Sequence, residues 1–273
     1  MSSISDGDTA APAPAPASRP ASLESLIVAA ALAAATALAW AWLLATSAAG
    51  GHAGHGMAGM AGMSGMGPAP LSAAYIASAF AMWAIMMVAM MLPSAAPMIL
   101  LRARIDKAGS RRGRMANSLL FALCYALVWT GFAALAALAQ ALLVASGAVS
   151  DMALAVGERT LAAGLLLLAA GYELTAAKRL CLDKCQSPIV FVLRYWKPGA
   201  KGAVRLGLAH GLYCVGCCWA LMLLLFVGGV MNLAWVAALG LIVLAEKLAP
   251  PLWRAERLVA AALAAGALAL LLF

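Results

Sequence analysis

Long stretches of apolar residues without a charged side chain are the feature that most restricts what this chain can fold into. Several run for about 20 residues, the length a helix needs to cross a hydrocarbon core roughly 30 Å thick. Hydrophobic residues make up 66% of the chain and charged residues only 10%, which excludes an ordinary soluble domain. Runs this long and rich in Ala and Leu favour helices over barrel strands. The sequence therefore predicts an all-α fold, a polytopic transmembrane helical bundle.

Polar links divide the chain into about seven spans. The apolar runs lie near 26–45, 71–101, 117–145, 158–177, 206–230, 232–245 and from 258 onward. The first lacks a basic leader and is long, so we expect an anchor rather than a cleaved signal peptide. The expected organisation is a disordered Ala/Pro tail at 1–22, a first transmembrane helix at 23–46, an outer Met/His-rich loop at 47–70 and a six-span membrane core at 71–273, with basic cytoplasmic loops at 102–116 and 178–205.

The placement of charge predicts the orientation. With seven alternating spans, all of the 18 Lys and Arg residues except Arg159 fall on one side, which the positive-inside rule makes the cytoplasmic side. We therefore expect a multi-pass protein of the bacterial inner membrane with a cytoplasmic N-terminus and a periplasmic C-terminus. Because the charges sit in the links and not on one face with base-reading residues, nucleic acid is not expected as a partner.

The outer loop repeats His and then Met with a period of three, in GHAGHGMAGMAGMSGMG. No bulky apolar residue is interleaved for these side chains to pack against. Thioethers are soft ligands suited to Cu(I), imidazole also binds copper, and thioethers stay usable where thiols oxidise. The loop is predicted to capture metal outside the membrane, the alternative being a low-complexity linker that tolerates Met. The expected ligands are His52, His55, Met57, Met60, Met63 and Met66.

The second span carries a stripe of methionines on one helical face. Residues four apart on a helix are neighbours, so flexible thioethers at this spacing can pass a soft cation from one to the next. Two prolines, Pro93 and Pro97, are expected to kink the helix. The alternative is that the methionines only fill gaps between helices. The stripe comprises Met82, Met86, Met87, Met90 and Met91.

The fifth span places thiols and an imidazole on one helical face. Thiolates and imidazole together make a soft-metal site, whereas a single cysteine is usually a small buried hydrophobe. Cys124 in the third span lies at a comparable depth and is a candidate to complete the site across helices. The set on the fifth span is His210, Cys214, Cys217, Cys218 and Met222.

A second pair of cysteines lies in the basic link after the fourth span. Cys181 and Cys185 are four residues apart among lysines and arginines, and nearby cations favour thiolates. With Glu173 at the inner end of the fourth span, they are expected to form an exit site. We interpret the adjacent residues Glu246 and Lys247 as an ion pair at the membrane interface.

Three segments resemble a known family. MWAIMMVAMMLPSAAPM, GYELTAAKRLCLDKCQSP and LAHGLYCVGCCWALMLLLFVGGVMNL are similar to motifs of a bacterial family of predicted metal-binding integral membrane proteins of unknown function. The resemblance covers roughly residues 75–250 and leaves out the tail and the outer loop. It implies metal binding without implying a reaction or a substrate. The methionine spacing also resembles that of eukaryotic high-affinity copper transporters, as a motif only.

The function expected from these features is membrane copper handling, by capture, transport or delivery of Cu(I), with zinc or no metal as alternatives. A transporter or metal-binding protein is expected rather than an enzyme, and no nucleotide-binding motif is present. The alternatives are a transmembrane thiol–disulfide carrier using Cys214 and Cys217, or an accessory subunit of a larger membrane metalloenzyme complex. Binding of haem by two histidines would need a second intramembrane histidine in addition to His210. Expected partners are the lipid bilayer, a metal ion and a periplasmic or cytoplasmic metallochaperone or membrane complex.

Overall fold

The chain folds into helices. The computed structural model describes residues 23–56, 69–106, 110–149, 156–249 and 254–272, and in these residues no sheet forms beyond one isolated bridge between Val149 and Val156. The helices are α1 (Leu23–Gly56), α2 (Ala73–Ile105), α3 (Arg111–Ala145), α4 (Arg159–Glu173), α5 (Ala176–Gln186), α6 (Pro188–Tyr195), α7 (Gly199–Leu223), α8 (Leu225–Gly228), α9 (Leu233–Leu248) and α10 (Ala255–Leu272). The predicted all-α fold is confirmed.

Each of the seven predicted spans coincides with helical structure. Among the described residues, α1, α2, α3, α7 together with α8, and α10 are each long and apolar enough to cross a membrane. Helices α4 and α5 reach that length only as a pair, which is bent by 66° at the break between them. Helix α9 has 16 residues, about 24 Å at ~1.5 Å per residue. The length criterion therefore supports five or six spans, and the seventh stays a prediction.

One helix end and one helix interior are notable beside the expected organisation. Helix α1 continues to Gly56, ten residues beyond the predicted end of the first span at residue 46, although glycine makes up four of these ten residues and favours helix weakly. Helix α2 remains helical through Pro93 and Pro97, although each proline removes one backbone donor from the helix.

Polar side chains define where several helices begin. The hydroxyl oxygens of Ser72, Ser110 and Thr175 accept hydrogen bonds from backbone N–H groups in the first turns of α2, α3 and α5. The Asn232 side chain does the same for α9. Such caps satisfy N–H groups that have no partner within the helix, so these short polar residues fix the helix starts.

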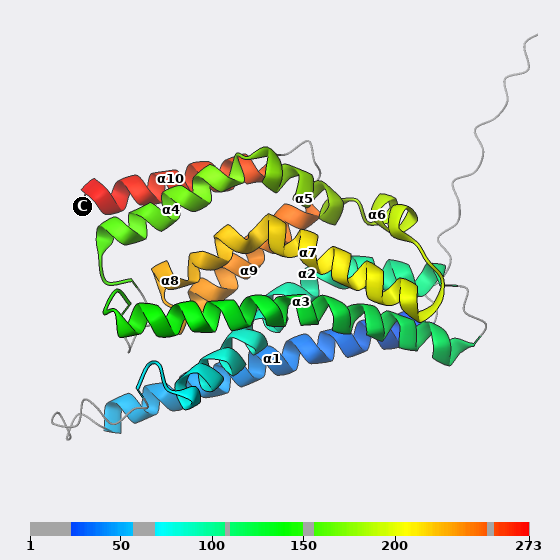
Figure 1. Cartoon of the computed structure of the whole chain (residues 1–273), viewed down its shortest axis with the longest axis horizontal. Coiled ribbons are helices and arrows are strands. Elements are labelled where there is room, and N and C mark those ends of the chain that lie inside the picture. Colours follow the sequence, from blue (N-terminus) through cyan, green and yellow to red (C-terminus); the bar gives the residue numbers. More distant parts are fainter. Residues whose placement is uncertain (1–22, 57–68, 107–109, 150–155, 250–253, 273) are drawn as a thin grey trace, which may run out of the picture.

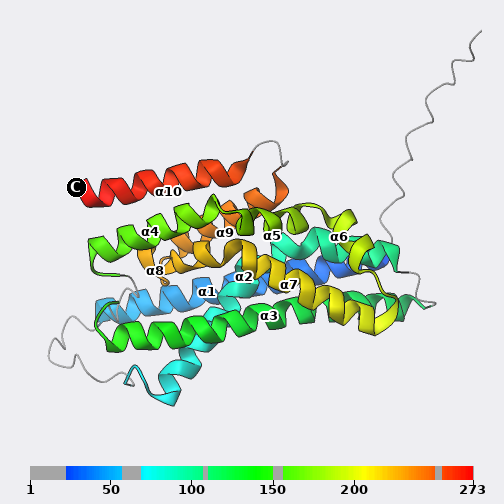
Figure 2. The same cartoon turned by 45° about the horizontal axis from the view of Figure 1, so that its top comes forward.

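The long helices α1, α2, α3 and α7 lie roughly along one common axis, and their ends gather at the two ends of the bundle (Figure 1). Figure 1 shows the beginnings of α1, α3 and α7, the end of α2 and the short helix α6 at one end. An ion pair supports this grouping, since Glu24 Oε1 of α1 lies 2.6 Å from Arg114 Nη2 of α3. Figure 2 shows the opposite ends of α1 and α3, together with α8 and the C-terminal end of α10, on the other side. Segments predicted to be basic links therefore share one end.

Helix α2 occupies the centre of the bundle. It packs against α1, α3 and α9, and α7 packs against α3 and α5. The largest fully buried side chains in this region include Trp83 of α2 and Trp129 of α3. The interior of the bundle is thus where α2, α3, α7 and α9 meet, and it is here that the sulfur-bearing side chains lie.

Candidate metal centre

The predicted face of α7 points into the bundle. His210, Cys214, Cys217, Cys218 and Met222 are all buried. Helix α3 lies unusually close to this face because two glycines carry no side chain there. An added Cβ at Gly207 would lie 2.9 Å from Cys124 Cβ, and one at Gly211 would lie 2.8 Å from Val128 Cβ. The predicted shared face is therefore correct, and small residues bring it against α3.

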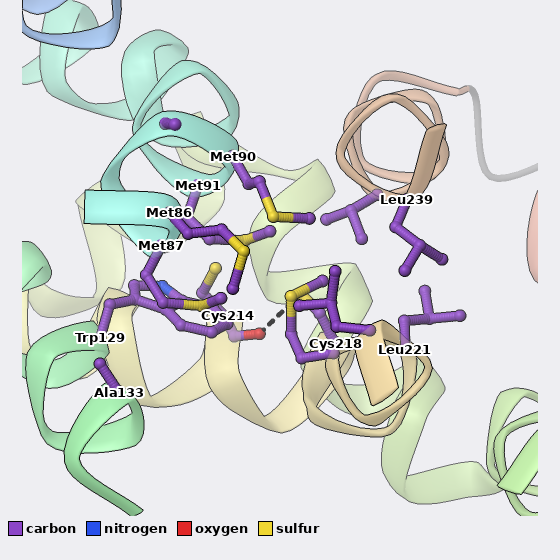
Figure 3. Packing of buried hydrophobic residues seen from close by; sticks show 14 of the residues in the cluster. Met86, Met87, Met90, Met91, Trp129, Ala133, Cys214, Cys218, Leu221 and Leu239 are labelled. Carbon is purple, nitrogen blue, oxygen red and sulfur yellow. Dashed lines mark hydrogen bonds between the residues drawn. The ribbon is translucent and has the colours of Figure 1, made fainter. Parts of the chain in front are cut away.

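The methionine stripe of α2 faces the same region. Met86, Met87, Met90 and Met91 are buried, and Figure 3 shows them extending from α2 toward Cys214 and Cys218 of α7. Met82 is half-buried and, with Met86, lines a cavity of about 130 Å³ bounded also by residues of α1 and by the segment before α9. Thioethers from one helix and thiols from another thus meet across the bundle core.

Cys214 lies at the centre of the polar contacts in this region. Its sulfur is 2.8 Å from Lys247 Nζ of α9 and 3.0 Å from the Tyr125 hydroxyl of α3. Lys247 also donates to Ser94 Oγ of α2, at 2.9 Å. The Tyr125 hydroxyl lies 3.0 Å from the Met91 carbonyl oxygen, to which it donates a hydrogen bond. An ammonium group beside a sulfur stabilises the thiolate, which is the form that binds metal.

His210 lies one helical turn before Cys214, in an aromatic cage. Its ring stacks on Phe121 and Tyr125, with centroid distances of 6.0 and 5.4 Å, and meets Phe191 of α6 edge-on at 5.6 Å. Its Nδ1 atom is buried and has no hydrogen-bond partner in the described residues. A buried nitrogen without a partner is costly, so this atom is a candidate ligand.

The cysteines of α5 approach α7. Cys217 Sγ lies 3.3 Å from Cys218 Sγ and 4.0 Å from Cys185 Sγ. Cys181 lies against Gly216, where an added Cβ would be 2.8 Å from its sulfur. The two predicted sites, which sequence spacing left separate, are therefore continuous. All six cysteines are free thiols.

The carboxylates predicted near the exit site have other partners. Lys178 Nζ lies 2.6 Å from Glu173 Oε1 and 2.8 Å from Glu246 Oε2, and all three side chains are buried. The structure thus places Glu173 in an ion cluster and not beside the two cysteines. The predicted Glu246–Lys247 ion pair is wrong: consecutive side chains on a helix point in different directions, so Glu246 faces Lys178 while Lys247 faces Cys214.

Cys124 does not join the sulfur atoms of the centre. It is buried against Gly207, which puts it about 10 Å along α7 from Cys214 at ~1.5 Å per residue.

Of the predicted outer ligands, His52 and His55 belong to the last turns of α1. Their side chains, and the predicted ligands Met57, Met60, Met63 and Met66, lie outside the part of the chain that the structure describes.

The donor set suits a soft ion. In the described residues, no three His, Cys, Asp or Glu side chains are arranged as a metal site. Cu(I) does not require such a set, because thioethers are also among its ligands. A thiol stabilised by an ammonium group, buried thioethers and an unpartnered imidazole nitrogen fit Cu(I) better than Zn²⁺, whose structural sites use four Cys or His ligands.

Sequence reasoning missed the two side chains that contact Cys214 most closely, Lys247 and Tyr125. Lys247 was interpreted as part of the charge bias that sets the orientation and as an interfacial ion-pair partner of Glu246, and Tyr125 was not singled out. A signal was present in the sequence. Lys247 comes directly after an apolar run and before Pro250 and Pro251, and the structure places it in the last turn of α9. Intramembrane lysines are rare enough to be functional candidates.

The comparisons with known proteins agree with this chemistry. The chain matches a protein family described as PpoB2, copper chaperone, over residues 80–270. No curated protein and no solved structure matched it. The matched region runs from within α2 to within α10, so it contains every described donor of the centre and leaves out the outer Met/His segment. The expectation of a metal-related bacterial family is confirmed, and the chain belongs to the PpoB2 family of copper chaperones.

Proposed function

We propose that this protein is a membrane-embedded chaperone that binds Cu(I) between α2 and α7 and passes it on. The observation that carries the proposal is the contact of 2.8 Å between Cys214 Sγ and Lys247 Nζ, inside a core that α2 lines with thioethers. Burying an ammonium group beside a thiol costs free energy, so this contact favours a thiolate that takes part in binding. Binding a soft cation is the use that the surrounding sulfur atoms support.

The outer faces of the helices support a membrane location. On α3, Leu123, Leu127 and Leu135 share one face and are 66%, 62% and 68% exposed. Long apolar helices with exposed leucines are unfavourable in water and favourable in lipid. The grouping of basic links at one end supports a cytoplasmic assignment for that end.

Reporter fusions test this orientation. Fusions at positions 108 and 190 should report the cytoplasm, and a fusion at position 60 should report the periplasm. A cytoplasmic position 60 would contradict the orientation.

The ligands we assign to Cu(I) come from both sides of the core. Cys214 and Cys218 supply sulfur from α7, Met86 and Met90 supply thioethers from α2, and His210 Nδ1 is the candidate nitrogen. Charge balance is consistent with this set. Lys247 offsets the Cys214 thiolate, and Cu(I) offsets a second thiolate formed when Cys218 loses its proton. The bound centre is then neutral, as a site of low dielectric requires.

A cavity beside the first methionines of α2 supports a route to the centre from the predicted periplasmic end. The cavity beside Met82 and Met86 is bounded by Thr46 and Ser47 near the end of α1 and by Met231 just before α9. It therefore lies beside the first two methionines of the stripe, near the last residues of α1 that line it. We assign the segment from His52 to Met66 as the collector of external copper and the Met82–Met91 stripe as its path inward.

Metal quantification on the purified full chain tests the proposal. The wild-type protein in detergent, loaded with Cu(I) under reductant and passed through a desalting column, should retain copper. Cys214→Ser should lower the retained copper, whereas the matched variant Cys124→Ser should not, because Cys124 lies away from the sulfur cluster. A wild-type protein that retains no copper, or a Cys214→Ser variant that retains the wild-type amount, would contradict the proposed centre.

The thiol–disulfide carrier is the weaker candidate. It requires Cys214 and Cys217 to cycle as a pair, yet the Cys214 sulfur contacts Lys247 and Tyr125, while the Cys217 sulfur is close to Cys218 and Cys185. Mass-tag trapping of thiols on the copper-loaded sample separates the two functions. A reversible Cys214–Cys217 disulfide without stoichiometric copper would favour the carrier.

A further inference from the structure

We infer that Cys185 and Cys217 form a second, two-coordinate Cu(I) site through which the ion leaves the buried centre for the surface of the protein. The inference rests on the proposed function and goes beyond it, because it names where the ion is handed over. It replaces the exit site predicted from Cys181, Cys185 and Glu173 by a pair of thiols on two different helices.

The separation of the two sulfur atoms carries the inference. Cys185 Sγ and Cys217 Sγ are 4.0 Å apart. A disulfide bond is only about 2.05 Å long, so the pair is far from bonded. A zinc–thiolate bond is about 2.3 Å long, so a metal ion of that size held linearly between two thiolates sets the sulfur atoms roughly 4.6 Å apart. The pair therefore matches one bridging soft ion after the two sulfur atoms move apart by about 0.6 Å.

The pair is continuous with the buried centre. Cys217 Sγ lies 3.3 Å from Cys218 Sγ, and the thiols of both residues donate to the carbonyl oxygen of Cys214, at 3.2 and 2.9 Å. An ion leaving Cys218 can therefore reach Cys217 without any movement of the backbone. Cys217 is fully buried, whereas Cys185 is half-buried. The sequence of sulfur atoms thus leads from the interior toward the surface.

The structure holds α5 firmly in the position that this requires. The Tyr172 hydroxyl, near the end of α4, donates to the Gly216 carbonyl oxygen of α7. The absence of a side chain at Gly216 lets Cys181 approach α7. The buried contacts of Lys178 with Glu173 and Glu246 then tie α5 to α4 and α9. The bend after Glu173 therefore presents a face of α5 to α7, with Cys181 and Cys185 one turn apart along it.

The transfer is a ligand exchange that conserves charge. As Cu–S bonds form to Cys217 and Cys185, the bonds to Cys218 and Cys214 break. Cys217 and Cys185 each lose one proton as they bind the ion. Cys218 takes up one of these two protons when the ion leaves it. The Cys214 thiolate stays deprotonated beside Lys247, so the other proton is released to solvent at the half-buried Cys185. Copper stays Cu(I) throughout, so neither an oxidant nor a reductant is needed.

The rate of copper transfer to a soluble chelator tests the inference. The full chain loaded with one Cu(I) is mixed with bathocuproine disulfonate under reductant, and formation of the coloured chelate is followed. Cys185→Ser should retain the loaded copper but release it at least tenfold more slowly than the wild type. The matched variant Cys124→Ser, which alters a thiol away from the pair, should release copper at the wild-type rate.

A second measurement tests the pair directly. A variant that keeps only Cys185 and Cys217, with the other four cysteines changed to Ser, should bind one Cu(I) with two sulfur neighbours by X-ray absorption. A variant that keeps only Cys185 and Cys124 should not. If the variants with four substitutions do not fold, the release rate of the single Cys185→Ser variant decides alone.

The outcomes separate this inference from the proposed function. A wild-type chain that retains no Cu(I) overturns both. A chain that retains Cu(I) while Cys185→Ser releases it at the wild-type rate overturns only the transfer site. A Cys185–Cys217 disulfide in protein that is copper-loaded and active in transfer also overturns the transfer site, since bonded sulfur atoms cannot hold the ion.

Discussion

The Lys247 ammonium nitrogen lies 2.8 Å from the Cys214 sulfur, and both side chains are buried in the centre of the bundle. This contact joins the short helix α9 to the cysteine face of α7. It gives the site a fixed positive charge that no ligand from solution has to supply.

Removing that charge should weaken copper binding. Methionine has a side chain of similar length to lysine but no ammonium group, so in Lys247→Met nothing replaces the charge that stabilises the Cys214 thiolate. Copper affinity should fall at least about tenfold, or ~1.4 kcal/mol, in a competition titration against a chelator of known affinity. Lys201→Met serves as the control, because Lys201 is exposed at the start of α7. Equal affinities for the two variants would show that the contact has no role in binding.

The aromatic cage around His210 allows packing and ligation to be separated. A phenyl ring in His210→Phe can keep the stacking on Phe121 and Tyr125 while losing the unpartnered Nδ1 atom. The free energy of unfolding should change by less than ~1.5 kcal/mol, as in other volume-conserving changes, while copper affinity falls. If His210→Phe binds copper as tightly as the wild type, His210 is a packing residue only.

The thioethers of α2 can be removed without a large change in volume. Met86→Leu with Met90→Leu should cost less than ~1.5 kcal/mol of stability per site and should reduce copper affinity, because leucine has no sulfur. Met98→Leu is the matched control, since Met98 is a buried methionine of the same helix outside the stripe. The comparison is made by thermal unfolding and copper titration of all three proteins. An equal loss in Met98→Leu would point to general packing.

The ion cluster at Lys178 is expected to matter for stability. Lys178→Met leaves the carboxylates of Glu173 and Glu246 buried without their shared cation, which should destabilise the protein by ~3–5 kcal/mol. Adding Glu173→Gln and Glu246→Gln should restore much of this loss, because the remaining groups are neutral. Thermal unfolding in detergent measures both effects. A single variant as stable as the wild type would mean that the cluster is not held by charge.

The sequence predicted what depends on spacing along one helix. The positions of His210, Cys214 and Cys218 fix a common face of α7 whatever surrounds it, and the methionines of α2 follow the same rule. Spacing does not say which face of another helix lies opposite. The contact between Lys247 and Cys214 joins residues 33 positions apart, and the approach of Cys185 to Cys217 depends on the bend after α4. Both arise from packing between helices, which no single-helix pattern encodes.

The close approach of α3 to α7 at Gly207 and Gly211 also bears on which ions the centre admits. With no side chain at these two positions, the helices leave little space around His210 and the cysteines, and the walls are aromatic rings and aliphatic carbon. Magnesium keeps several water molecules when it binds, and calcium requires six to eight oxygen ligands. The oxygen atoms near Cys214 are those of Tyr125, Ser94 and Met91, which are too few to replace the oxygen ligands that these ions require. We therefore expect the backbone at these two glycines, neither of which is assigned as a ligand, to disfavour the abundant hard cations of the cell by holding the two helices close together.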